Sequence, residues 1–185
     1  MQKDRKRTLL SSLLVLGLTL VFATSSLAQG QADDDNPSVA GAVFVGTNHN
    51  NMHPTAPAGE PANQVIMYQR AHNGTLSFVG RFDTGGQGSG PSIRFAGDGL
   101  GSSRSLQLSQ DNRWLFVANA ASNNISVFSV SKKKLELTDV EPSNGVFPNS
   151  IAQHGDLVYV LNSAGAGNIT GFRLSNHGRL PVYFC

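Results

Sequence analysis

The chain has 185 residues, a formal net charge of +2 at pH 7, 39% hydrophobic residues and one cysteine. This length favours a single folded domain, and the lone cysteine excludes an internal disulfide framework. The slight basic excess comes from the first seven residues, so nothing in the remainder indicates nucleic acid or an anionic membrane surface as a partner.

The N-terminus has the layout of a cleaved export signal. Basic residues at positions 3–7 precede an apolar run from Leu9 to Ala23, and Ser26-Leu27-Ala28 supplies small residues at a cleavage site. The alternative is an uncleaved anchor, but this run of 15 residues is short for a bilayer span. We predict a signal peptide over residues 1–28, a secreted or periplasmic mature protein, and no membrane span after cleavage.

Residues 29–38 are predicted to be a flexible, solvated linker, because they are polar and carry three consecutive acids, Asp33 to Asp35. A calcium site is the alternative, but three adjacent carboxylates of an extended chain cannot all face one ion. No cofactor or metal is expected here.

From residue 39 onward, short runs rich in Val, Ile and Phe are separated by Gly, Asn, Asp and Pro, which predicts strands and turns without helices. The predicted strands are residues 40–48, 64–71, 75–84, 105–109, 114–119, 124–131, 135–141, 149–154, 157–162, 168–175 and 179–184. The glycine-rich segment from Gly85 to Gly101 is predicted to be a connection.

Two stretches of the chain repeat each other. Leu115–Asn119 followed by Asn124–Phe128 returns as Val158–Asn162 followed by Asn168–Phe172, and Asn162 lies 43 residues after Asn119. A period of this size, filled with short strands and turns, is typical of one propeller blade per repeat. We predict an all-β fold, a β-propeller of four-stranded antiparallel blades. The blades are expected at residues 39–84, 105–141 and 149–185.

Three blades are fewer than the roughly four to eight with which propellers close. The first predicted blade lacks its first strand, which is expected when a ring closes with a strand from the far end of the chain. We therefore expect an N-terminal fragment of a larger propeller, produced by a frameshift or a truncated gene. We expect this fragment to be inactive alone and to self-associate through its unpaired sheet edges.

Six segments match the pattern of one known family: residues 63–66 (NQVI), 74–76 (GTL), 84–90 (TGGQGSG), 109–119 (SQDNRWLFVAN), 122–128 (SNNISVF) and 155–162 (GDLVYVLN). With them, residues 41–180 resemble the secreted β-propeller lactonase family, related to bacterial 6-phosphogluconolactonase and fungal carboxymuconate cyclase. The resemblance implies a seven-bladed propeller that hydrolyses or forms a lactone ring, with a small lactone or sugar-derived ligand. The alternative is a non-catalytic propeller binding module on the cell surface or in the periplasm.

The chain departs from this family where the innermost strands begin. Many members have a Pro-His pair there, but the corresponding pairs are Ser103-Arg104 and Pro148-Asn149. No catalytic residue of the family can be carried over, so the catalytic residues stay unassigned.

The candidate ligand-binding residues are Arg104, Asn149, His49 and His53, on the face where antiparallel strands gather the longer loops. Arg104 and Asn149 are expected beside the central channel. The planar guanidinium of Arg104 fits a carboxylate or phosphate, whereas the alternative is an arginine bonded to loop carbonyls. His49 and His53 lack further metal ligands nearby, so solvated histidines are expected.

Two other residue types in the repeats have a structural interpretation. We expect Trp114 to pack in the core, with a sugar-stacking platform as the alternative. Asn119 and Asn162 recur at strand ends, where they are expected to satisfy the backbone groups of turns.

Overall fold

The computed structural model describes residues 39–90, 101, 102 and 104–184. The predicted signal peptide and linker, part of the Gly85–Gly101 connection, residue 103 and Cys185 lie outside the described residues. Within them, no helix is long and apolar enough to cross a membrane. The strands are β1 (Val39–Gly46), β2 (Gln64–Ala71), β3 (Leu76–Asp83), β4 (Leu106–Leu108), β5 (Trp114–Asn119), β6 (Asn124–Val130), β7 (Leu135–Pro142), β8 (Val146–His154), β9 (Leu157–Ala164), β10 (Asn168–Arg173) and β11 (Val182–Phe184).

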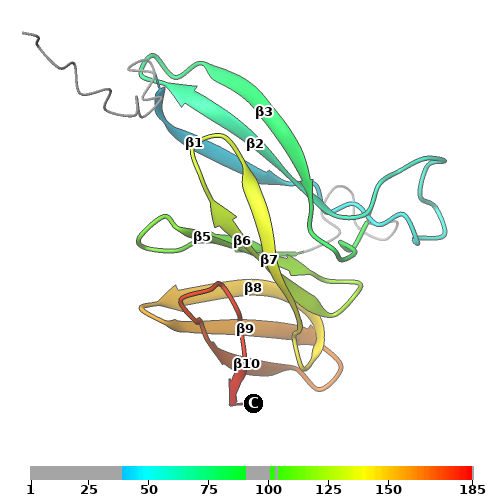
Figure 1. Cartoon of the computed structure of the whole chain (residues 1–185). Helices are drawn as coiled ribbons and strands as arrows, with labels where there is room; N and C mark the ends of the chain where they lie inside the picture. The colour runs from blue at the N-terminus through cyan, green and yellow to red at the C-terminus, as the bar shows by residue number, and fades with distance from the viewer. Residues whose placement is uncertain (1–38, 91–100, 103, 185) are drawn as a thin grey trace, which may run out of the picture. The chain divides into compact units, whose positions relative to one another are not determined.

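These strands form three antiparallel sheets (Figure 1). The first sheet has the order β1-β2-β3, the second β4-β5-β6-β7 and the third β8-β9-β10-β11. Within each sheet, strands that follow one another along the chain pair, so each sheet is a meander. The predicted all-β fold of antiparallel propeller blades is confirmed, with three strands in the first blade and four in each of the others.

The middle strand β5 explains how the sheets pack. All six of its residues are buried. Because side chains alternate along a strand, Trp114 and Phe116 face the third sheet and join one core cluster with Val160. Leu115 and Val117 point the other way and join a second cluster with residues of the first sheet. The second sheet is therefore covered on both faces, which explains why β5 is nearly free of polar residues.

The strand ends agree with the sequence prediction within three residues, and the starts of β8 and β11 differ most. β8 begins at Val146 and not at residue 149, and β11 begins at Val182 and not at residue 179. The preceding segment leaves the sheet because the backbone N–H of Leu180 donates to Asp139 Oδ2 of β7 at 2.7 Å. Leu180 itself is fully buried in the cluster between the second and third sheets. A local contact with the neighbouring blade thus replaces ladder pairing at these positions.

Candidate functional site

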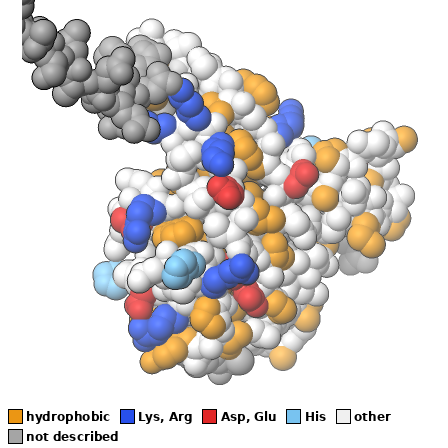
Figure 2. Space-filling model, in the orientation of Figure 1, with side chains coloured by type: hydrophobic (Ala, Val, Ile, Leu, Met, Phe, Trp, Pro, Cys, Tyr) orange, Lys and Arg blue, Asp and Glu red, His pale blue; other side chains and the backbone are white. Residues whose placement is uncertain are grey.

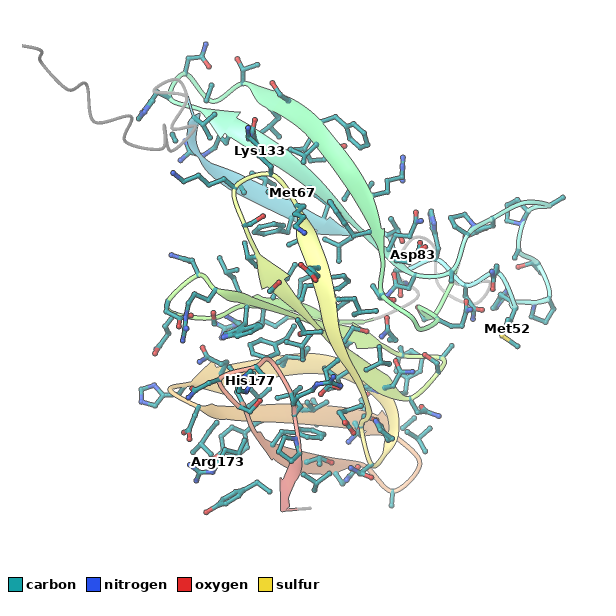
Figure 3. All side chains as sticks on the ribbon, in the orientation of Figure 1. Met52, Met67, Asp83, Lys133, Arg173 and His177 are labelled. Atoms are coloured by element: carbon teal, nitrogen blue, oxygen red, sulfur yellow. The ribbon has the colours of Figure 1, made fainter. Side chains whose placement is uncertain are left out.

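The antiparallel strands divide their connections between two faces. One face, here called the long-loop face, carries residues 47–63, the described parts of 84–105, and residues 120–123, 143–145 and 165–167. The opposite face, called the turn face, carries residues 72–75, 109–113, 131–134, 155–156 and 174–181. In Figure 1 the β1–β2 loop and the β9–β10 turn extend to the right, whereas the β4–β5 and β8–β9 turns lie to the left. Figure 3 places Met52 far out on the β1–β2 loop.

The β1–β2 loop is fastened to the segment that follows β3. The side chain of Asn48 donates to Ser89 Oγ at 2.7 Å and accepts from the Ser89 backbone N–H at 2.8 Å. The N–H of Gly88 donates to the carbonyl of His49 at 2.7 Å. A Cβ at Gly88 would come within 2.3 Å of the Asn48 backbone, so only glycine allows this approach. These contacts therefore fix the β1–β2 loop against the segment that follows β3.

A buried hydrogen-bond network lies beneath these loops, centred on Asn119. Asn119 Oδ1 accepts from Asn63 Nδ2 and from Thr84 Oγ1, both at 2.8 Å. Its Nδ2 donates to Ser126 Oγ and to Asn124 Oδ1, both at 2.7 Å. Asn63, Thr84, Asn119 and Ser126 are each at most 2% exposed. The network joins the first blade to the second at the base of the long-loop face.

The third blade repeats part of this arrangement around Asn162. Asn162 Nδ2 donates to the carbonyl of Ser143 at 3.1 Å, as expected for an asparagine that satisfies a turn. A Cβ at Gly145 would come within 2.4 Å of Asn162 Cγ, and a Cβ at Gly86 within 2.5 Å of Asn119 Cγ. The sequence pattern did not single out these two glycines, although each lies two residues after the Thr or Ser that directly follows an outer strand.

Arg104 lies where the innermost strands of two blades meet. It forms a parallel bridge with Ser150, and its carbonyl accepts from the N–H of Ile151 at 2.9 Å. Its side chain is exposed. The guanidinium makes no hydrogen bond or ion pair with any described residue, including the loop carbonyls of the alternative interpretation. The backbone of Arg104 is thus fixed while its charged group is free to meet a ligand.

Asn149 occupies the equivalent position on β8 but is only 8% exposed. A register shift between Pro148 and Ser150 marks an irregularity in the strand at this residue. Ser102 connects the two candidate residues, because its hydroxyl donates to the carbonyl of Asn149 and accepts from the Arg104 N–H. The structure therefore brings the backbones of Arg104 and Asn149 to one place and offers only the arginine side chain to solvent.

The two histidines have different surroundings. His53 Nδ1 is 3.0 Å from Thr55 Oγ1, at the exposed part of the β1–β2 loop. His49 is partly enclosed, and its Nδ1 is buried without a hydrogen-bond partner, which differs from the solvated histidine expected. The described residues contain no cluster of three or more His, Cys, Asp or Glu that could hold a metal ion.

Comparison with known proteins adds a family and a fold. The model of a family described as lactonase, seven-bladed β-propeller, matches residues 58–181, which is more than half of the chain. No curated protein is significantly similar to the chain.

Similar solved structures include a functionally unknown protein from Desulfotomaculum acetoxidans, with 22% identity and a TM-score of 0.51, and a protein from Lactobacillus plantarum, with 20% identity and a TM-score of 0.51. A periplasmic gluconolactonase from Pseudomonas aeruginosa has 22% identity and a TM-score of 0.49. Each match covers 64% of this chain and, in the same order, 33%, 34% and 32% of the other protein. At this identity the first two matches show the fold alone, and the matched part spans about a third of those proteins.

Proposed function

Since this chain belongs to the lactonase family of seven-bladed β-propellers, we propose that it is an exported lactonase-like protein whose long-loop face receives a lactone or its ring-opened acid. One observation carries the choice of site. The guanidinium of Arg104 is exposed and makes no hydrogen bond or ion pair with the described residues, while its backbone is fixed between the innermost strands of two blades.

The chemistry of lactone hydrolysis explains why an arginine suits this place. Water adds to the ring carbonyl carbon and the ring C–O bond breaks. The ring oxygen takes one proton of the water and the other proton is released, which leaves a carboxylate and a hydroxyl. Negative charge develops on the carbonyl oxygen during this step, and a fixed cation stabilises it. The two parallel N–H groups of a guanidinium also match the planar carboxylate of the product.

The reaction further requires a general base for the attacking water. His49 and His53 are the imidazoles on the long-loop face among the described residues, and the Nδ1 of His49 is buried. We assign Arg104 to ligand binding and offer His49 as the first residue to test for the base. Asn149 has the supporting role of holding the Ser102 connection beside Arg104.

The test measures hydrolysis of glucono-δ-lactone and of its phosphate ester in a pH-stat, against the buffer rate, by a closed seven-bladed propeller that contains this chain, since its three blades alone are expected to be inactive. We expect turnover above buffer and a loss of about 10- to 100-fold in kcat/KM for Arg104→Gln, because a charged hydrogen bond is removed. Arg104→Lys should recover only part of the loss. The matched control is Arg81→Gln, an exposed arginine on β3.

Absence of turnover above buffer on either lactone would contradict a hydrolase. Equal kinetics for Arg104→Gln and Arg81→Gln would contradict the site. His49→Gln separates the two roles, since loss of a base lowers kcat and leaves the KM for the phosphorylated lactone nearly unchanged.

A non-catalytic binding module is the second candidate. It is favoured by the residues at the start of the innermost strands of the second and third blades. These positions hold Arg104 and Asn149, and neither is a histidine. Saturable binding of gluconate that depends on Arg104, in the absence of any lactone turnover, would support this candidate over the enzyme.

A further inference from the structure

The turn face contains a hollow of ≈ 290 Å³ between the second and third sheets. It is lined by the β4–β5 turn, the β8–β9 turn and the segment after β10. The backbone N–H of Gln110 donates to Gln153 Oε1 at 3.2 Å and ties the first two of these together. The volume is close to the lower end of the roughly 300 to 1,000 Å³ typical of ligand pockets. One small molecule of about monosaccharide size would fit.

Three side chains at this hollow have polar groups without a partner. The amides of Gln110 and Asn176 are exposed and make no hydrogen bond with the described residues. The indole N–H of Trp114 also has no partner among them. These groups come from three different segments and line the same hollow, where they can reach one ligand.

Trp114 does not offer a ring face. It is 8% exposed and belongs to the core cluster between the second and third sheets. Gly178 packs against its six-membered ring, and a Cβ there would come within 2.3 Å of Trp114 Cζ3. The core packing predicted for Trp114 is therefore confirmed, and the stacking platform is wrong. The polar group that the indole has to offer a ligand in the hollow is its N–H donor.

The charges around the hollow are already paired. Arg113 Nε contacts Asp111 Oδ2 at 2.6 Å, and Arg173 pairs with Asp156. Hydrogen bonds from Ser109 and Arg113 lower the pKa of Asp111 to about 2, so this carboxylate is ionised at neutral pH. Figure 2 likewise shows acidic and basic side chains interspersed over the visible face, without a large patch of one sign. An anionic ligand would find no unpaired cation here to attract it.

We propose that this hollow binds a neutral sugar unit. Sugar hydroxyl groups both donate and accept, and they match two amides, an indole N–H and the second oxygen of Asp156. A purely apolar ligand would leave these polar groups unpaired, and an aromatic ligand would find no exposed ring face. The site lies on the face opposite Arg104, so it is independent of the proposed lactone site.

Trp114 is the only tryptophan of the chain, so intrinsic fluorescence reports on this hollow directly. We would titrate the full chain with D-glucose, D-galactose and D-mannose, and with gluconate as the anionic comparator. We expect a saturable change with at least one neutral sugar and none with gluconate. Gln110→Ala and Asn176→Ala should each raise the apparent Kd by up to about tenfold. The matched control is Asn51→Ala, an exposed asparagine of the long-loop face.

A second variant tests the indole N–H without relying on fluorescence. Trp114→Phe keeps an aromatic ring in the core, and saturation-transfer NMR on the sugar should show weaker binding than in the unmodified chain. Far-UV circular dichroism checks that each variant is folded. The proposal is overturned if no neutral sugar gives a saturable change. It is also overturned if the Gln110 and Asn176 variants bind the sugar as tightly as Asn51→Ala.

Discussion

At the scale of single residues, Asn119 and Asn162 hold the same place in two blades and yet differ in their partners. Asn119 exchanges hydrogen bonds with four side chains, whereas Asn162 donates to one carbonyl and to Thr170 Oγ1, and its Oδ1 has no partner in the described residues. Replacing a buried asparagine leaves the polar groups that it paired without hydrogen-bond partners, which costs about 1 to 3 kcal/mol for each group.

We therefore expect Asn119→Ala to lower the free energy of unfolding by about 2 to 5 kcal/mol, since it leaves Asn63 Nδ2 without an acceptor and Ser126 Oγ without a donor. Asn162→Ala is the matched control and should cost less. Urea denaturation followed by circular dichroism measures both. Equal losses for the two variants would show that the network around Asn119 adds nothing to the packing.

Asp111 gives a prediction about pH. Its pKa is lowered to about 2 by hydrogen bonds from Ser109 and Arg113. A carboxyl group with a lowered pKa stabilises the folded state above its unfolded pKa of 3.8, and this contribution disappears as the pH falls through about 2.

We expect Asp111→Asn to reduce the loss of stability between pH 4 and pH 2, while leaving the loss caused by other carboxyl groups. The measurement is the urea midpoint at several pH values. Asp83→Asn on β3 serves as the control, since Asp83 is exposed. An unchanged pH profile for Asp111→Asn would contradict the lowered pKa.

The positions of these residues could be predicted from the sequence, but their hydrogen-bond partners could not. The repeat identifies Asn119 and Asn162 because both end a strand with the same apolar pattern. Their partners are harder to predict, because Thr84 lies 35 residues before Asn119 and belongs to the preceding blade. The position of Arg104 could likewise be predicted. Whether its guanidinium makes hydrogen bonds could not, because that depends on which loop carbonyls the fold places near it.

At the scale of elements, the connection from one blade to the next depends on a close approach between a glycine and an asparagine. A Cβ at Gly86 would come within 2.5 Å of Asn119 Cγ, which is closer than carbon atoms can pack. Gly155, in the β8–β9 turn, has a φ of 60° but nothing within 4 Å of the position of a Cβ. Alanine at Gly155 therefore costs only backbone strain, of about 1 kcal/mol.

We expect Gly86→Ala to destabilise the chain by more than Gly155→Ala, and by about 2 kcal/mol or more, because buried side chains must move to make room. Thermal unfolding of the two variants side by side measures the difference. A larger loss for Gly155→Ala would contradict the close packing at the Asn119 network.

The strands themselves could be predicted well, because each has a simple local pattern. β5 reads as an unbroken apolar run, and its predicted bounds, Trp114–Asn119, are those observed. β11 could not be placed as well, since its start is set by the bond from Leu180 to Asp139 on another blade. Local pattern predicts an element, and contacts between blades set where it begins and ends.

At the scale of the whole molecule, the two outer sheets each have one face that no other described sheet covers. Phe78 on β3 is 60% exposed, and Leu161 and Ile169 on the third sheet are 42% and 56% exposed. Apolar side chains gathered on a sheet face favour association with another sheet. We expect these faces to add to the unpaired sheet edges in driving self-association of the chain.

Sedimentation velocity over a range of protein concentrations tests this expectation. Ile169→Lys should shift the distribution toward the monomer, because a charge on the uncovered face opposes burial. Met52→Lys is the control, since Met52 is 80% exposed but lies on the β1–β2 loop (Figure 3). A chain that is monomeric at all concentrations would contradict the expectation.

We propose the long-loop face, with Arg104 at its base, as the functional face of this propeller. A two-dimensional NMR titration of the ¹⁵N-labelled full chain with gluconate, the acid that glucono-δ-lactone releases, tests it most directly. We predict saturable shifts of the amide signals of Ser102, Arg104 and Ile151, which the structure ties together, and their loss in Arg104→Gln. Shifts confined to the turn face, or none at any gluconate concentration, would contradict the claim.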